Sequence, residues 1–331
     1  MIRKWGKNVF IPILLFIVGL ILLIKGGDWF VDGATGIAHR FHLPEILIGA
    51  TVVSIGTTLP EVMVSATSAI SGNGEIAYGN AIGSIICNTA LVAAITVAVR
   101  PSKIERNSLK LPVIFFFIAA GIYSVIAYVF GFFYRFAGVI LFTIFVVYMI
   151  LSVIKSIKTP QRNDRSSNYD NLSNQPIIKE LICLIVGAAL IAIGSKLLVD
   201  NGTVIAQKLG VPEAVIALTL VALGTSLPEL VTAITSLMKG HSALSLGNVI
   251  GANFFNLVIV SGVSAVISPF SVPNSAQIAG INASLLVDIP VMLFVMALLT
   301  LPALIRGKLS RVQGVALITV YLAFCVFRFI V

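Results

Sequence analysis

Residues 51–61, TVVSIGTTLPE, recur in closely similar form 168 residues later as residues 219–229, TLVALGTSLPE. Each copy places a Gly, a Pro, two adjacent hydroxyl side chains and one carboxylate inside an otherwise apolar run. A charge buried in bilayer hydrocarbon costs roughly 2.5 kcal/mol or more, so a membrane-spanning helix seldom keeps one without a use. Glu61 and Glu229 are therefore the first candidates for functional residues.

The composition of the chain indicates a membrane protein. Its 331 residues are 58% hydrophobic and only 11% charged, against roughly 25% charged in an average soluble domain. The apolar segments reach about 20 residues, the length at which a helix crosses roughly 30 Å of hydrocarbon, whereas barrel strands need only about ten. We expect an all-α polytopic membrane protein in a lipid bilayer. The net charge of +9 comes mostly from loops and forms no aromatic-interleaved patch, so we expect no nucleic-acid partner.

The hydropathy pattern predicts ten transmembrane helices. We place them at residues 9–38, 43–71, 76–99, 109–130, 134–156, 177–207, 211–239, 243–267, 277–301 and 310–330. Residues 158–176, rich in Ser, Asn and charge, can bury little apolar surface and are predicted to be a hydrophilic linker. The linker divides the chain into a first five-helix repeat, residues 1–157, and a second one, residues 177–331.

The two halves are related by duplication. Residues 44–88 and 212–256 align without a gap and share 18 identities in 45 positions. Because each half contains an odd number of spans, the second enters the membrane in the opposite orientation, which gives two inverted five-helix repeats. This plan is typical of secondary transporters, whose binding site lies near the midplane where broken helices meet.

The distribution of basic residues predicts the orientation in the membrane. The side bearing the linker carries 14 of the 22 Lys and Arg residues, and the opposite side carries six. By the positive-inside rule we expect a cytoplasmic linker and both termini outside, in the cell membrane. Three basic residues at the extreme N-terminus argue weakly the other way: Arg3, Lys4 and Lys7.

Each signature stretch brings oxygen atoms together on one helical face. Pro60 has no N–H for the carbonyl of Gly56, so a kink there would expose backbone oxygen, and Pro228 repeats the arrangement at Gly224. A Thr lies four residues before each Glu, on the same face of a helix. The helices that follow add further polar side chains: Ser84 and Asn88 in the first half, Asn248 and Asn256 in the second.

These groups supply only oxygen ligands and two formal negative charges. Hard cations such as Ca²⁺, which takes about six to eight oxygens, suit this set, whereas soft transition metals prefer Cys or His. The three Cys residues are odd in number and widely spaced, so we interpret them as packing residues. The three His residues lie near predicted membrane edges.

Simpler interpretations apply to single residues in this set. A Gly-Pro kink is common in membrane helices, and an Asn or Thr there more often bonds a neighbouring helix than a ligand. Four Asp residues lie nearer helix ends, where solvation at the membrane interface explains them: Asp28, Asp32, Asp200 and Asp288. A carboxylate without an obvious basic partner in the middle of a span has no such explanation.

The paired motifs resemble a known family. GTTLPE with GNAIGSIICN, and GTSLPE with GNVIGANFFN, are similar to the two alpha repeats of the sodium/calcium exchangers in the cation/calcium antiporter superfamily, and the layout matches the compact prokaryotic type. The resemblance implies that Ca²⁺ and Na⁺ are transported without an organic cofactor. It also implies that the ions are surrounded by Thr57, Thr58, Glu61, Ser84 and Asn88 of the first repeat, Thr225, Ser226, Glu229 and Asn256 of the second, and the backbone carbonyls of Ser54 and Ala222.

The chain departs from some prokaryotic members of that family at two positions. Ala252 stands where those members carry a Ser hydroxyl, and Asn256 stands where they carry an Asp carboxylate. The departures concern the ion stoichiometry and the identity of the driving ion.

Three hypotheses for the function follow. The first is antiport of Na⁺ for Ca²⁺ by alternating access, with one Ca²⁺ or two monovalent ions neutralising the two glutamates. The second keeps the fold and couples Ca²⁺ to H⁺ through protonation of Glu61 and Glu229, and the third is a passive cation channel. No nucleophile and base occur at a recognisable spacing, so we do not expect an enzyme. We expect a functional monomer in which the first helices of each half, residues 10–39 and 176–208, slide against a fixed core.

Overall fold

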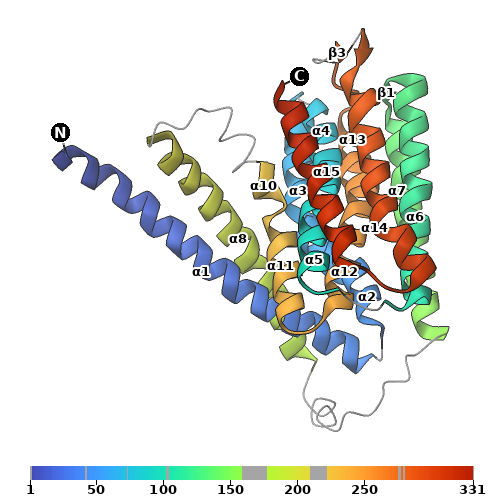
Figure 1. Cartoon of the computed structure of the whole chain (residues 1–331), viewed down its shortest axis with the longest axis horizontal. Helices are drawn as coiled ribbons and strands as arrows, with labels where there is room; N and C mark the ends of the chain where they lie inside the picture. Colours follow the sequence, from blue (N-terminus) through green and yellow to red (C-terminus); the bar gives the residue numbers. More distant parts are fainter. Residues whose placement is uncertain are drawn as a thin grey trace.

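The computed structural model describes residues 2–41, 43–72, 74–101, 104–158, 177–208, 222–274, 277–278 and 280–330, nearly all of them helical (Figure 1). The part before the linker contains α1 (Ile2–Arg40), α2 (Glu45–Ile48), η1 (Gly49–Val53), α3 (Ser54–Ile70), α4 (Gly74–Cys87), η2 (Asn88–Ala93), α5 (Ala94–Val99), α6 (Arg106–Val125), η3 (Ile126–Phe130), β1 (Phe132–Phe133) and α7 (Arg135–Lys158). The part after it contains α8 (Ile178–Lys208), α10 (Ala222–Thr225), α11 (Leu227–Met238), α12 (Ser242–Phe255), η5 (Asn256–Val260), α13 (Ser261–Ile267), β2 (Phe270–Ser271), β3 (Gln277–Ile278), β4 (Ile281–Asn282), η6 (Ser284–Asp288), α14 (Ile289–Arg306) and α15 (Arg311–Ile330). The η segments are π-helical turns inside otherwise α-helical rods.

Nine helical segments in the described part of the chain are long and apolar enough to cross a membrane. The expectation of an all-helical, multi-pass membrane protein is therefore confirmed. The helix predicted over residues 211–239 is described only from residue 222 onward, as α10 and the 12-residue α11. Its earlier part, and residues 159–176 of the predicted linker, lie outside the described residues.

The helix predicted over residues 277–301 is shifted in the structure. A small antiparallel hairpin, β3 paired with β4, occupies its expected first turns, with Gly280 at a φ of +80° in the turn. The side-chain oxygen of Asn282 accepts a hydrogen bond from the Ser284 N–H at 2.8 Å, just where the helical segment η6 begins. The helix then continues to Arg306 and ends at Gly307, where φ is +65°.

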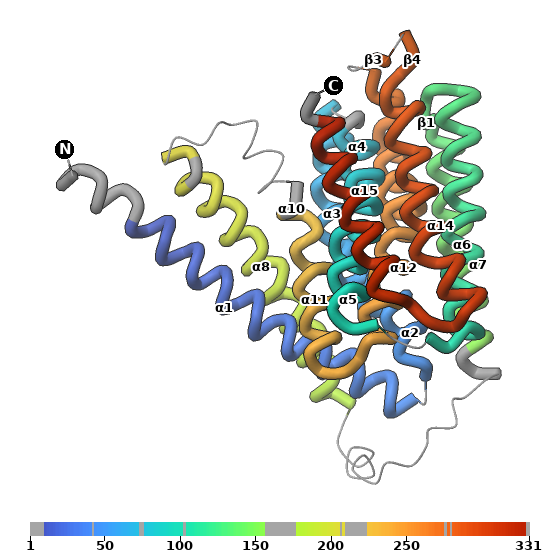
Figure 2. Tube along the Cα trace, in the orientation of Figure 1, coloured from blue at the N-terminus to red at the C-terminus, as the bar shows by residue number. Residues whose placement is uncertain are grey.

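The helices α1 and α8 form a separate pair inclined away from the rest of the molecule (Figures 1 and 2). Their backbones touch at glycines: a Cβ on Gly19 would lie 2.9 Å from the carbonyl oxygen of Gly194, and one on Gly26 would lie 2.9 Å from that of Gly187. Residue numbers rise on one helix as they fall on the other, so the pair is antiparallel. Arg40 and Glu180 join its far end in an ion pair of 3.0 Å.

The remaining helices pack around α12, whose residues from Leu244 to Phe255 are all buried. Large apolar side chains of α1, α7 and α8 are exposed on the outside of the molecule, as a lipid-facing surface requires. The polar exceptions to this pattern gather where α12 meets α3 and where α11 meets η2.

Candidate functional site

The described residues of both signature stretches lie on helices near the centre of the molecule. Residues 51–53 belong to η1 and residues 54–61 to α3, while residues 222–229 of the second stretch lie on α10, on α11 and at Ser226 between them. α3 packs against α4, α12 and η5, while α11 packs against α12 and η2. Glu61 and Glu229 are both fully buried, with exposed fractions of 0%. The two carboxylates therefore lie inside the protein rather than at a lipid or water surface.

Contacts between the two halves bring these side chains together. The Thr57 hydroxyl donates to the side-chain oxygen of Asn248 at 3.2 Å and lies beside the Glu229 carboxylate. Glu61 is close enough to Glu229 for the two carboxylates to repel each other. Glu229 and Ser226 also neighbour Cys87, the last residue of α4, immediately before Asn88.

The buried polar atoms of this region lack protein partners. Within the described part of the chain, eight carboxylate and amide atoms have no hydrogen-bond partner: both carboxylate oxygens of Glu61 and of Glu229, and the side-chain oxygen and nitrogen of Asn88 and of Asn256. The hydroxyls of Thr58 and Ser226 also have none. Native proteins rarely leave buried polar groups unpaired, because each costs about 1–3 kcal/mol. So many unpaired oxygens around two charges fit the coordination of a hard cation.

Two fully buried residues of this region, Glu61 and Glu229, carry a formal charge. Among the described residues, no cluster of three or more His, Cys, Asp or Glu side chains is arranged to hold a metal ion. Neutral hydroxyl, amide and carbonyl oxygens would complete the shell around a cation.

The two asparagines of the site each open a π-helical segment. Asn88 begins η2 and Asn256 begins η5. The Ser261 hydroxyl donates to the Asn256 carbonyl, five residues earlier, at 3.3 Å. Ser54 likewise donates to the carbonyl of Gly49, the first residue of η1, at 2.6 Å. A π-helical turn displaces side chains from the regular α-helical positions and is frequent at functional sites.

The two Pro residues of the signature have different consequences. α3 continues from Ser54 to Ile70 with Pro60 inside it. The second copy is interrupted at Ser226, whose φ and ψ are −90° and 6°, and α11 starts anew with Pro228 in its first turn. The two halves therefore present different backbone to the site, although their sequences are alike.

The remaining predicted site residues are placed less uniformly. Ser84 is buried one turn before Asn88, and the Ser54 carbonyl lies 3.5 Å from the Thr57 hydroxyl. Thr225 ends α10 and is only half-buried, and it lines a groove facing α8. Ala222 is the first residue of α10.

Two further asparagines organise the site and stand at equivalent positions of the repeats. Asn80 donates to the Glu61 carbonyl at 3.2 Å and to the Ser65 hydroxyl at 2.9 Å. The side-chain oxygen of Asn248 accepts a hydrogen bond from the Thr57 hydroxyl. The backbone carbonyl of Asn248 accepts a hydrogen bond from the Ser54 hydroxyl at 3.0 Å. In the sequence, the one indication of this role is that both repeats carry Asn at this position.

One expectation about acidic residues is wrong. Asp288 is 5% exposed and pairs with Arg328 at 3.4 Å, so burial beside a cation, not solvation at an interface, explains its presence. His241 is likewise held, 2.8 Å from a carboxylate oxygen of Glu45.

The helices α1 and α8 cover one side of the site. A Cβ on Gly56 would lie 3.0 Å from the ring of Phe30, which places α1 directly against α3. Phe30, Thr57 and Ile191 line one small cavity between these helices. Displacement of α1 and α8 would therefore change access to Thr57.

Comparison with known proteins identifies the family. The chain matches the family described as "Sodium/calcium exchanger protein" over residues 11–154 and 179–330. This protein belongs to the sodium/calcium exchanger family. It is 32% identical to sodium/calcium exchanger MaX1 of Methanosarcina acetivorans, over 96% of this chain and 98% of the relative, and 33% identical to inner membrane protein YrbG of Escherichia coli, over 83% and 86%. The structure of the sodium-calcium exchanger NCX_Mj soaked with 2.5 mM Na⁺ and 10 mM Sr²⁺ superposes with a TM-score of 0.80, at 31% identity, over 95% of this chain and 98% of that one. The resemblance seen in the motifs is confirmed, including the compact prokaryotic type.

Proposed function

We propose that the protein is a secondary antiporter that exchanges Na⁺ for Ca²⁺ across the membrane by alternating access. The observation that carries the proposal is the group of unpaired buried oxygens around Glu61 and Glu229. Two negative charges are neutralised by one Ca²⁺ or by two Na⁺. The empty site keeps two buried charges, whose passage through low dielectric is costly, so transport is an obligatory exchange and not a leak.

The ions in this proposal are transported substrates bound by oxygen. Their ligands are Ser54, Thr57, Thr58, Glu61, Ser84, Asn88, Ala222, Thr225, Ser226, Glu229 and Asn256, with Ser54 and Ala222 contributing backbone carbonyls. The burial of Glu61, Glu229, Asn88 and Asn256 supports the central part of this set. Thr225 is half-buried and lines the groove beside α8, which supports a position at the edge of the proposed site.

The architecture proposed for exchange is a pair of inverted five-helix repeats, residues 1–157 and 177–331, joined by a cytoplasmic linker. The pairing of glycines at 19 with 194 and 26 with 187 supports a two-fold relation between α1 and α8. These two helices slide as a unit against the rest of the molecule. The protein functions as a monomer in the cell membrane, with both termini outside, and is a transporter without enzymatic activity.

The proposal is tested with purified protein in liposomes loaded with Na⁺. Radiolabelled Ca²⁺ should enter only while the Na⁺ gradient lasts, and Glu61→Gln or Glu229→Gln should abolish entry. Asp200→Asn is the matched control, because this carboxylate is 57% exposed on α8 and pairs with Lys196 of the same helix. Uptake that persists after the Na⁺ gradient has collapsed would contradict the proposal.

A second candidate, exchange of H⁺ for Ca²⁺, rests on the same unpaired carboxylates. Both glutamates can accept protons, and the buried Ala252 offers no hydroxyl for Na⁺. A pH gradient in Na⁺-free buffer distinguishes the two candidates. Ca²⁺ uptake under that condition would favour H⁺ coupling, and its absence favours Na⁺ coupling.

A further inference from the structure

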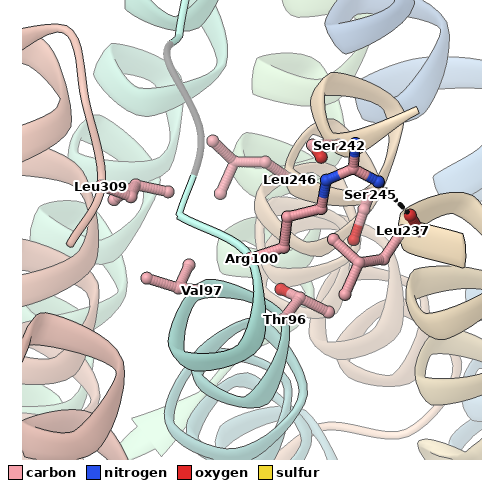
Figure 3. Close-up of a pocket in the computed structure, with 8 residues that line it drawn as sticks. All are labelled: Thr96, Val97, Arg100, Leu237, Ser242, Ser245, Leu246 and Leu309. Carbon is pink, nitrogen blue, oxygen red and sulfur yellow. Dashed lines mark hydrogen bonds between the residues drawn. The ribbon is translucent and has the colours of Figure 1, made fainter. Parts of the chain in front are cut away.

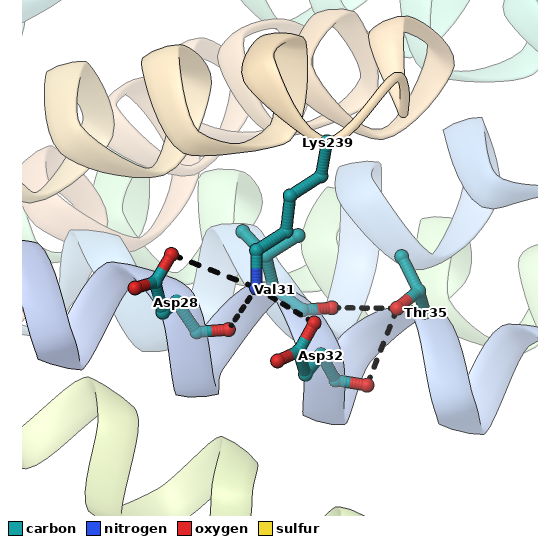
Figure 4. A network of polar contacts seen from close by, with 5 residues as sticks. All are labelled: Asp28, Val31, Asp32, Thr35 and Lys239. Atoms are coloured by element: carbon teal, nitrogen blue, oxygen red, sulfur yellow. Dashed lines mark hydrogen bonds and ion pairs between the residues drawn. The ribbon is translucent and has the colours of Figure 1, made fainter.

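The pair of α1 and α8 contacts the core at several places, and the most extensive of these contacts is where α1 meets α11. A Cβ on Gly27 would lie 2.8 Å from both the Thr235 hydroxyl and a methyl group of Val231, so the two helices are in direct contact there. One turn further along, Lys239 follows the last residue of α11 and reaches across to α1 (Figure 4). The contact lies toward the end of the molecule where α7 ends and α8 begins (Figure 1).

Lys239 binds α1 through three oxygen atoms. Its ammonium group lies 2.7 Å from a carboxylate oxygen of Asp32 and 3.6 Å from one of Asp28, and it donates to the backbone carbonyl of Asp28 at 2.9 Å. The Lys239 side chain is only 26% exposed. A partly buried cation shared by two carboxylates binds more strongly than an isolated surface pair.

The end of α11 is held by the core on its other side. Arg100, which follows α5, donates to the carbonyl of Leu237 at 3.2 Å (Figure 3). The same carbonyl also accepts a hydrogen bond from the Gly240 N–H at 3.1 Å, and Arg100 adds a positive charge at this helix C-terminus. Lys239 therefore joins α1 to a helix end that the core already positions.

The repeat supplies a counterpart for every member of this contact. Adding or subtracting 168 relates Gly27 to Ser195, Val231 to Met63, Thr235 to Thr67, Lys239 to Ser71, Asp28 to Lys196 and Asp32 to Asp200. The counterpart contact would join α8 to α3, as the observed one joins α1 to α11.

The counterpart contact is open in this structure. Met63 on α3 and Ser195 on α8 both line a groove of about 820 Å³, and Met63 is 64% exposed. The Thr67 hydroxyl bonds the Met63 carbonyl in its own helix at 2.7 Å. The structure thus shows one of two repeat-related contacts closed and the other open.

The cation of the closed contact, Lys239, has no charged equivalent in the open one. Ser71, at the position equivalent to Lys239, is neutral, and its hydroxyl bonds Thr67 at 3.0 Å. Lys196 and Asp200 pair with each other within α8 at 3.0 Å. Closing the groove would therefore bring no cation from α3 to Asp200.

We propose that Lys239, Asp28 and Asp32 form an ionic latch on one side of the exchanger only. The latch stabilises the conformation in which α1 is docked on α11 relative to the conformation in which α8 is docked on α3. The role of the latch rests on the proposed exchange mechanism, because it sets the balance between the two states through which ions pass. It is a positioning device: none of its three side chains belongs to the proposed ion site.

Removal of the latch should shift this balance. A pair of this kind contributes about 1 kcal/mol, which is about a fivefold change in an equilibrium constant. Lys239→Met keeps the apolar stem and removes the charge. Because apparent affinity scales with the fraction of protein that is open to a given side, the ratio of the two apparent Ca²⁺ affinities, measured from opposite faces of oriented liposomes, should change about fivefold.

A structural readout tests the latch independently of transport. Backbone hydrogen exchange of residues 24–40 and 226–240 should become faster in Lys239→Met in cation-free buffer. Lys239→Arg keeps the positive charge and the donors for Asp28 and Asp32, so it should retain the slow exchange and the wild-type affinity ratio. Lys196→Met is the matched control, since it removes one Lys charge from an ion pair that lies within a single helix, α8.

The outcomes separate the latch from the exchange mechanism. If hydrogen exchange and the affinity ratio in Lys239→Met equal those in Lys196→Met, the latch is refuted. Faster hydrogen exchange in Lys239→Met but not in Lys239→Arg supports the latch, even if the wild-type protein moves no Ca²⁺. Absence of Ca²⁺ transport by the wild type would overturn only the proposed function.

Discussion

The charge of Glu61 provides the most direct test of the site. Glu61→Gln preserves the shape of the side chain and removes one of the two negative charges. The attraction between unit charges 4 Å apart is about 4 kcal/mol at an effective dielectric constant of 20. At about 1.4 kcal/mol per tenfold change in affinity, the variant should bind Ca²⁺ roughly a thousandfold more weakly.

The same substitution should stabilise the protein when no cation is bound. The two carboxylates are buried close enough to repel each other when both are ionised, and neither has a hydrogen-bond partner among the described residues. Replacing one by a neutral amide removes this repulsion and the cost of an unpaired buried charge, which is several kcal/mol for an isolated ion. The cation-free variant should therefore unfold at a higher temperature than the wild type.

Thermal unfolding in detergent, with and without Ca²⁺, measures both effects. At a Ca²⁺ concentration about 100 times its dissociation constant, the wild type gains about 2.7 kcal/mol of stability. Glu61→Gln should gain almost none at that concentration, although it starts from a higher unfolding temperature. Asp200→Asn should behave as the wild type in both conditions. A Ca²⁺-induced rise in Glu61→Gln equal to that of the wild type would refute the two-glutamate site.

Four further outcomes are expected. Asn256→Asp should leave the reversal potential of exchange unchanged if two glutamates set the charge of the site; a shifted sodium-to-calcium ratio would show that position 256 carries an essential charge in its Asp form. Asn248→Ala should weaken Na⁺-dependent Ca²⁺ uptake about fivefold, because the Thr57 hydroxyl loses its acceptor and a buried hydrogen bond contributes about 1 kcal/mol. Unchanged Ca²⁺ uptake would show that Asn248 is not part of the site. Gly26→Ala should lower stability by about 1–3 kcal/mol, since its Cβ would meet backbone of α8 at 2.9 Å, whereas Gly121→Ala, with no atom within 4 Å, should not. Cross-linking α8 to α3 across the groove should stop exchange and leave Ca²⁺ binding measurable; normal exchange in the cross-linked protein would show that the two helices do not move apart.

The glutamates and their neighbouring hydroxyls were predictable because hydrocarbon makes polar groups conspicuous. A carboxylate in an apolar run of helical length has few explanations, and its recurrence 168 residues later excludes chance. Helical spacing then places Thr57 on the face of Glu61 without any knowledge of the fold. The burial of both glutamates agrees with this reasoning.

The π-helical segments were not predictable in the same way. A π turn adds one residue to a helical turn, and the residues of η5, NLVIV, have the same apolar character as the α-helical turns beside them. The local signal is a Ser hydroxyl five residues after the first residue of the segment, as Ser54 and Ser261 show. Since Ser is common in membrane helices, that signal alone selects no position.

There is a more general reason why the sequence does not predict the different roles of equivalent residues in the two halves. A duplicated sequence assigns equal roles to Asn80 and Asn248, yet the first bonds its own half and the second bonds the other. A single conformation of an exchanger must break this equality, because a site open to one side requires one repeat-related contact to be closed and the other open. In the exchange mechanism proposed above, we expect the contacts that differ between the halves to be the ones that change during transport; examples are Gly27 of α1, which packs against α11, and Ser195 of α8, which lines a groove. We expect the features that are alike in both halves, the buried glutamates and the asparagines that open π segments, to stay in place around the ions.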